Sequence, residues 1–471
     1  AEQVLDVAGV ALPTLGLADW QQLLSQLNPT NRLLLQRLPR LPAGELCAHT
    51  DTRWQARALP PSPAPTANLA GRLGPCLGPL AEAPKGLRWS SVAPGLRLQR
   101  FSPQGGALRT RLAWCWADSS ATLAERRWLQ ACWTLQSEAL ERWGARVGVG
   151  LQWSLAPGQL VLDVRGPQAL LPGFVRELLS QLQTPPAASQ LPLIERRSRR
   201  WLQDEQDALP AWRLLQTLEQ ERSTSALRLR DPLALWQRLC GQAQIIWLKP
   251  DGWPEAERSQ VAKLLINLCP SLMQPFAWCC PLPQLQPGQL QVSEVSSRHT
   301  DRAQLLYLPA EGDSLLEAAC WRLLHHRLAD PFFAELRTRQ QLGYWVVARL
   351  HRRAGRPGLL LLVQSPDRSH RCIESAVDRF LDQSLEDLGA VSADQLQTQA
   401  THLSQLLEQQ RLHPQQGFEA HWEDCLWQRE DQLAAEQQAL LELTAAHWNA
   451  FVGRLPQSAR WRLLSRQAGA D

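Results

Sequence analysis

The run DPFFAELRTRQQLGYWVV, Asp330 to Val347, decides how the rest of the chain is arranged. Its first half continues an expected helix, residues 314–336, because leucine and alanine recur there at helical spacing. From residue 344 to 350 the chain changes to β-branched and aromatic residues, which are typical of a strand. Gly343 lies at the junction, where a chain that leaves a helix often needs a positive φ. The sequence therefore predicts a sharp corner between a long helix and a strand.

Two polar side chains, Arg337 and Tyr344, are predicted to flank this corner. A permanently charged guanidinium and a phenol held close together are well suited to binding the carbonyl oxygens of an extended peptide. A simpler interpretation makes Arg337 a cation at a helix C-terminus, where the helix dipole favours it, and Tyr344 an ordinary strand aromatic. From the residues alone the simpler interpretation is favoured.

A single order of elements (strand, helix, strand, strand, helix) occurs twice in the chain, offset by roughly two hundred residues. The first copy comprises residues 108–116, 123–143, 147–154, 159–164 and 170–182, and the second comprises 304–308, 314–336, 344–350, 358–364 and 373–388. The sequence thus predicts an α+β fold of two repeated domains. Each is expected to be a largely antiparallel sheet with helices on one face.

Composition divides the remaining chain. Residues 1–58 carry too few expected elements to bury an independent core. Residues 59–94 are rich in proline and glycine, which break regular structure, so this stretch is interpreted as a linker. The two repeats are then expected at 95–285 and 286–471.

Charge and cysteine content exclude several classes of protein. A formal net charge of +4 over 471 residues argues against a protein that binds nucleic acid by neutralising phosphates. No apolar run approaches the ~20 residues of a membrane helix. The 11 cysteines include no C-x-x-C pair, which favours free thiols in a reducing compartment. We expect a bacterial, cytoplasmic protein that binds neither nucleic acid nor membrane.

Catalytic and metal motifs are absent from the sequence. No two of the 10 histidines are spaced i, i+4, so neither H-x-x-E-H nor H-E-x-x-H occurs. The adjacent His325 and His326 would point about 100° apart on a helix, so they cannot chelate one ion from a single face. No G-x-S-x-G or phosphate-binding glycine loop occurs either. The sequence therefore predicts no catalytic residue and no metal ligand in this chain.

The segment LRTRQQLGYWV, residues 336–346, resembles the L-R-T-x-x-Q-L-G-Y-x-V signature in the last domain of the pitrilysin/insulysin zinc peptidases. The likeness continues through residues 352–355, 358–359, 364–365 and 373–388. That family is built from four α+β repeats, and its zinc motif lies on the first. The resemblance implies that this chain is the zinc-free C-terminal half: the tail of the second repeat, a connector, and inactive third and fourth repeats.

The resemblance also implies a role for Arg337 and Tyr344. In the family the matching residues reach across a closed chamber and hydrogen-bond the substrate backbone near the scissile carbonyl. The chain would close this chamber over a zinc-bearing N-terminal half, on the same polypeptide or a separate one, and the complete enzyme would cleave peptides. The alternative is a non-catalytic structural or partner subunit of a peptidase-like heterodimer. Retention of Arg337 and Tyr344 favours the peptidase.

Overall fold

The computed structural model describes residues 45–47, 52–54, 90–101, 108–117, 120–219, 231–274 and 285–467. The chain divides into two compact units, residues 1–80 and 81–471. In the first unit, the short strands β1 (Glu45–Cys47) and β2 (Thr52–Trp54) pair antiparallel. Most of the expected tail (1–58) and linker (59–94) lies outside the described residues.

The first sheet of the second unit has six strands in the order β3-β4-β8-β5-β7-β6. Its strands are β3 (Ser90–Ala93), β4 (Leu96–Phe101), β5 (Leu108–Cys115), β6 (Gly150–Ala156), β7 (Gln159–Gly166) and β8 (Gln244–Pro250). All neighbours run antiparallel except β4 and β8, which are parallel.

The second sheet has five strands in the order β11-β12-β10-β13-β9. Its strands are β9 (Leu290–Ser297), β10 (Arg302–Pro309), β11 (Trp345–Arg353), β12 (Arg356–Ser365) and β13 (Arg460–Gln467). Again one pair, β9 and β13, is parallel. The order β4-β8-β5-β7-β6 in the first sheet corresponds strand for strand to β9-β13-β10-β12-β11 in the second. Corresponding neighbours are parallel or antiparallel in the same way. The predicted α+β repeat is confirmed.

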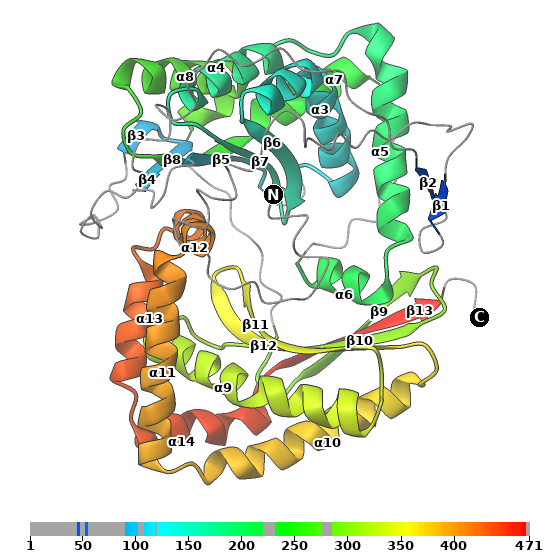
Figure 1. Ribbon diagram of the computed structural model, residues 1–471, viewed down its shortest axis with the longest axis vertical. Helices are drawn as coiled ribbons and strands as arrows, with labels where there is room; N and C mark the ends of the chain where they lie inside the picture. Colours follow the sequence, from blue (N-terminus) through cyan, green and yellow to red (C-terminus); the bar gives the residue numbers. More distant parts are fainter. Residues whose placement is uncertain are drawn as a thin grey trace. The chain divides into compact units, whose positions relative to one another are not determined.

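Each sheet carries its own helices on one face (Figure 1). On the first sheet these are α3 (Leu123–Arg146), α4 (Leu171–Leu182), α5 (Leu191–Gln206), α7 (Pro232–Gln242) and α8 (Glu255–Leu268). On the second they are α9 (Leu315–Phe333), α10 (His370–Gly389), α11 (Ala393–Leu412), α13 (Gln432–Leu441) and α14 (Ala445–Arg454). Several begin at a side-chain cap, as α9 does at Ser314, whose hydroxyl accepts from the Glu317 amide.

The opposite face of each sheet is covered by one helix from the other repeat. Strand alternation sends Leu306 toward α9 and Leu305 to the other face, where α6 (Pro210–Glu219) packs. Figure 1 shows α6 across the second sheet from α9 and α10. In the same way α12 (Pro414–Trp427) covers the far face of the first sheet, where Phe418 and Trp422 pack on β5, β7 and β8. The repeats thus exchange one covering helix each.

Candidate functional site

The corner after α9 is built on a wide helical turn. The α-helix ends at Phe333 and continues as a π-helix, Ala334–Arg339, in which the Gln340 amide donates to the Glu335 carbonyl oxygen at 2.9 Å. Such turns insert one extra residue and are frequent at functional sites. Leu336 and Leu342 are buried on either side of the turn, so it is anchored in the core.

Gly343 has a different role from the one expected. The positive φ lies at Gln341, with φ 48°, whereas Gly343 has none. A Cβ atom on Gly343 would lie 2.2 Å from the carbonyl oxygen of Gln364 on β12, far inside van der Waals contact. Glycine is therefore required here because the backbone of the corner passes directly against β12. The expectation of a left-handed Gly343 was wrong.

Arg337 extends from the π-helix and is exposed. Its Nη1 donates to the carbonyl oxygen of Gly343 at 2.7 Å, which ties the helical turn to the start of the strand. One guanidinium N–H makes this bond out of the five that arginine offers. The Arg337 side chain is thus fixed to the backbone of the residue before Tyr344 while it stays accessible.

Tyr344 follows Gly343 in the chain, and it is 43% exposed. Its hydroxyl donates to Asp301 Oδ2 at 2.5 Å, and it accepts a hydrogen bond from Gln364 Nε2. Partial desolvation and the neighbouring Asp301 carboxylate raise the pKa of Tyr344 to about 12. Asp301 and Gln364 were not predicted as part of the site. Asp301 is 43 residues from Tyr344 in the chain, and it lies beside Gln364 because β10 and β12 pair with Arg302 opposite Ser365.

An aromatic pair stands next to Tyr344 in the chain. Trp345, the first residue of β11, makes an edge contact with Trp212 of α6, with ring centroids 5.2 Å apart. Trp212 is 51% exposed, so the pair presents apolar surface to solvent. The covering helix α6 therefore adds an apolar element beside the polar corner.

Histidines and carboxylates do not gather into a metal centre in the part of the chain that the structure describes. No group of three or more His, Cys, Asp or Glu side chains is placed there to hold a metal ion. His326 faces the ring of His402, with centroids 5.8 Å apart. Burial, partly offset by a hydrogen bond to the Ala348 backbone, lowers the pKa of His325.

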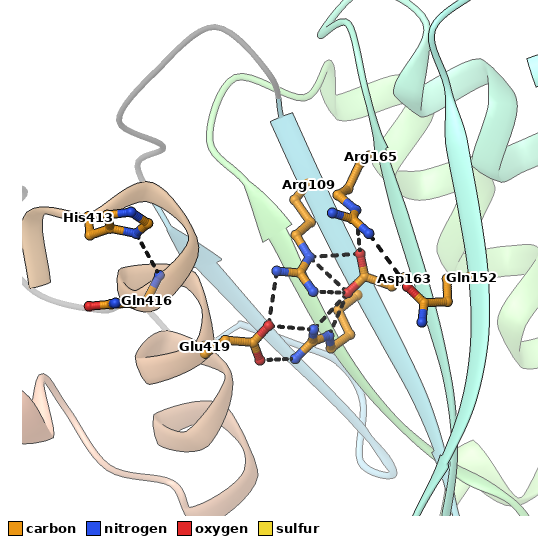
Figure 2. Close-up of polar contacts among 8 residues, drawn as sticks. Arg109, Gln152, Asp163, Arg165, His413, Gln416 and Glu419 are labelled. Carbon is orange, nitrogen blue, oxygen red and sulfur yellow. Dashed lines mark hydrogen bonds and ion pairs between the residues drawn. The ribbon is translucent and has the colours of Figure 1, made fainter. Parts of the chain in front are cut away.

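A charged cluster joins α12 to the first sheet (Figure 2). Asp163 on β7 accepts from Arg109 and Arg111 on β5, and Glu419 on α12 accepts from Arg111 Nη1 at 2.6 Å. The Arg109 guanidinium also lies over the Phe418 ring, 4.2 Å from its centroid. Every charge here meets a partner of opposite sign, so the cluster fastens α12 to the first sheet.

None of the helices described is both long enough and apolar enough to cross a membrane.

Sequence comparisons point to one family. A family model described as "PQQ synthase PqqF-like, C-terminal lobe domain 4" matches residues 323–422, which include the corner. Coenzyme PQQ synthesis protein F of Pseudomonas syringae pv. tomato is 34% identical over 192 residues, which are 40% of this chain and 24% of that protein. Human nardilysin is 27% identical over 176 residues, 34% of this chain and 15% of nardilysin. The chain thus spans about a quarter or less of the length of the curated relatives it matches.

Comparison with solved structures supports the fold. The crystal structure of pitrilysin superimposes with a TM-score of 0.67 at 16% identity, covering 83% of this chain and 44% of pitrilysin. A peptidase M16 inactive domain from Pseudomonas fluorescens gives a TM-score of 0.57 at 14% identity, covering 82% of this chain and 99% of that one.

Together with the repeated fold, these similarities confirm the expected resemblance: the chain is similar to the C-terminal half of pitrilysin-family proteins. Among the proteins of that family, it is similar to PqqF, the coenzyme PQQ synthesis protein F.

Proposed function

We propose that this chain is the substrate-gripping half of a zinc endopeptidase that processes the peptide precursor of pyrroloquinoline quinone. In this proposal a zinc-bearing N-terminal half, on the same polypeptide or another, supplies the metal, the activated water and the general base. The present chain closes the chamber and binds the peptide backbone near the scissile bond. We place the complete enzyme in the bacterial cytoplasm, although one protein of similar fold is described as a periplasmic protease, PqqL of Escherichia coli.

The observation that carries the proposal is the exposure of both Arg337 and Tyr344 at one rigid corner. Arg337 is bonded to the Gly343 carbonyl oxygen, and Tyr344 is bonded to Asp301 and Gln364, so both side chains are held in one orientation. An oriented donor such as the Arg337 guanidinium stabilises developing negative charge without reorganising, and two fixed polar groups align the substrate for attack. Nothing in a purely structural subunit requires two oriented, solvent-exposed polar groups here.

A non-catalytic partner subunit remains the second candidate. It is favoured by the similarity in fold to a peptidase M16 inactive domain. Under this alternative, Arg337 and Tyr344 only stabilise the corner.

Reconstitution separates the two functions. The chain alone should show no peptidase activity and bind no zinc stoichiometrically, and activity should appear when it is combined with the zinc-bearing half. In that complete enzyme, Arg337→Ala is expected to lower peptide turnover by at least roughly tenfold with zinc content unchanged, the scale of losing one oriented donor.

Arg339→Ala is the matched control, because Arg339 is also exposed on the π-helix but pairs with Glu335 on that same turn. Equal turnover in wild type and Arg337→Ala would reduce Arg337 to a structural residue and leave the partner-subunit function standing.

A further inference from the structure

The donor and the acceptor of each hydrogen bond around Tyr344 can be assigned, and the assignment starts from the buried side-chain amide of Gln364. Gln364 is fully buried, and its Oε1 accepts from the backbone N–H of Ala211 at 3.0 Å, in the first turn of α6. A backbone N–H can only donate, so the oxygen of the Gln364 side chain must be the atom that faces Ala211. The other end of the amide, Nε2, is then necessarily the donor.

That donor points at both Asp301 and Tyr344. Gln364 Nε2 lies 3.0 Å from Asp301 Oδ2 and also donates to the Tyr344 hydroxyl oxygen. One lone pair of the phenol oxygen is therefore occupied. The phenol proton cannot be directed at Gln364 Nε2, and the Asp301 carboxylate, which has no proton of its own, receives it at 2.5 Å. The phenol has no second proton to offer a ligand.

We propose that Asp301 is a positioning residue that holds the Tyr344 proton, so that the phenol oxygen binds a substrate amide N–H while Arg337 binds a carbonyl oxygen. This inference rests on the proposed function, since it specifies which backbone groups of the peptide are bound by the same corner. An extended peptide presents N–H and C=O groups alternately along its edge, and a strand edge offers both kinds together. An acceptor and a pure donor fixed at one corner match that pattern, whereas two donors would match only carbonyl oxygens.

Tyrosine titration tests the position of the proton without any peptidase assay. The chain contains only 2 tyrosines, Tyr307 and Tyr344, so their absorbance changes can be assigned with Tyr344→Phe. Tyr307 is buried, which raises its pKa still further, so Tyr344 should ionise first. Replacing the carboxylate by a neutral amide, Asp301→Asn, should lower the midpoint of Tyr344 from about 12 toward the value of ~10 typical of tyrosine. An unchanged midpoint in a folded variant would overturn the assignment.

The titration requires strongly alkaline solution, in which the protein can unfold, so a second measurement is made at neutral pH. With tyrosine labelled at Cζ, the chain should give two carbon resonances, and only that of Tyr344 should move in Asp301→Asn. Asp367→Asn is the control, because Asp367 is an exposed carboxylate just beyond the end of β12 that accepts from Ser365 and not from a phenol. A Tyr344 resonance that moves equally in both variants, or in neither, would contradict the role of Asp301.

Whether Tyr344 accepts a hydrogen bond from a substrate N–H is tested in the complete enzyme with ester analogues of the peptide. In each analogue one backbone N–H outside the scissile bond is replaced by oxygen. One ester should lower turnover roughly tenfold, about as much as Tyr344→Phe does on the all-amide peptide. On that ester, Tyr344→Phe should then cost little more. If the two losses multiply at every position, Tyr344 does not accept from an amide and the inference fails.

If Tyr344→Phe and Arg337→Ala are both without effect on the all-amide peptide, the proposed function itself fails, whatever the titration gives.

Discussion

The guanidinium of Arg337 donates a hydrogen bond of 2.7 Å to the carbonyl oxygen of Gly343, the residue directly before Tyr344. This bond closes the corner between the π-helix and β11, and the Tyr344 amide then donates to the Gln364 carbonyl oxygen at 3.1 Å. The two exposed side chains therefore share one backbone support. Anything that moves the Gly343–Gln364 contact should move both.

Gly343→Ala should disrupt that support. The new Cβ atom would lie 2.2 Å from a backbone oxygen, which cannot rotate away as a side chain could. We expect a loss of roughly 1–3 kcal/mol in the free energy of unfolding, measured with urea, together with a changed Tyr344 titration. Gly453→Ala in α14 is the control: a Cβ atom there meets nothing within 4 Å, so stability should stay the same or rise. A stable Gly343→Ala variant with unchanged titration would show that the close contact is not needed.

Phe418→Ala should loosen α12 from the first sheet. Phe418 is buried against β5, β7 and β8 and also lies under the Arg109 guanidinium. Removing a buried aromatic ring leaves a cavity, with an expected cost of roughly 3–5 kcal/mol in the free energy of unfolding. Phe333→Ala, at a site that is 49% exposed, should cost far less. Similar losses for the two variants would mean that α12 contributes little to the stability of the sheet.

Glu419 should make the folded state sensitive to acid. Burial opposes its ionisation, but the hydrogen bonds and charges of Arg111 and Arg109 prevail and lower the pKa of Glu419 below its usual 4.5. A carboxyl whose pKa is lowered by folding stabilises the folded state above its unfolded pKa, and this contribution is lost as the pH falls through the lowered value. Wild type should therefore be more stable than Glu419→Gln at pH 7, and the difference should shrink as the pH falls below about 4.5 and vanish below the lowered pKa of Glu419.

Because half of the Glu419 side chain is exposed, solvent screening limits the difference at pH 7 to about 1 kcal/mol. Urea unfolding at several pH values measures it. Glu294→Gln removes an exposed ion pair with Arg466 and should change stability less. A difference between wild type and Glu419→Gln that is as large at pH 3.5 as at pH 7 would rule out the ion pairs as its source.

Asp424 should have the opposite dependence on pH. Burial raises the pKa of Asp424 to about 7, although the amide of Gln432 donates to its carboxylate. Between about pH 4 and 7 the folded state thus holds a proton that the unfolded state has released, so stability falls as the pH rises. Asp424→Asn keeps an acceptor for the backbone N–H of Gln432 and removes this loss of stability at high pH. It should be more stable than wild type at pH 8 by roughly 1–3 kcal/mol, with little difference at pH 4.

A constant difference between Asp424→Asn and wild type across this pH range would show that the carboxyl group titrates normally in the folded state.

Local patterns in the sequence predicted the elements that surround the corner. The change from helical to strand spacing near Gly343 located α9 and β11, and the same pattern near residue 147 located α3 and β6. The strands β4, β8, β9 and β13 were not predicted. Each sheet forms its one parallel pair from such strands, and the partners are far apart in the chain, as Leu96 and Ile245 are. No short-range signal records a pairing of that kind.

The candidate site was predicted only in part for the same reason. Arg337 and Tyr344 lie in one continuous motif, so a resemblance could single them out. Asp301 joins them through the register between β10 and β12, and Ala211 joins them through the packing of α6. Gly343 was singled out for the wrong physical reason, because the approach of β12 to its backbone depends on tertiary structure.

The exchange of α6 and α12 means that neither repeat can be regarded as a self-sufficient folding unit. A fragment ending near residue 274 would keep the first sheet but lack α12, and it would carry α6 without the sheet on which that helix packs. Each separated fragment would present a bare apolar sheet surface, the kind of surface that drives aggregation. Evolution could therefore duplicate or lose these repeats far more readily as a pair than singly.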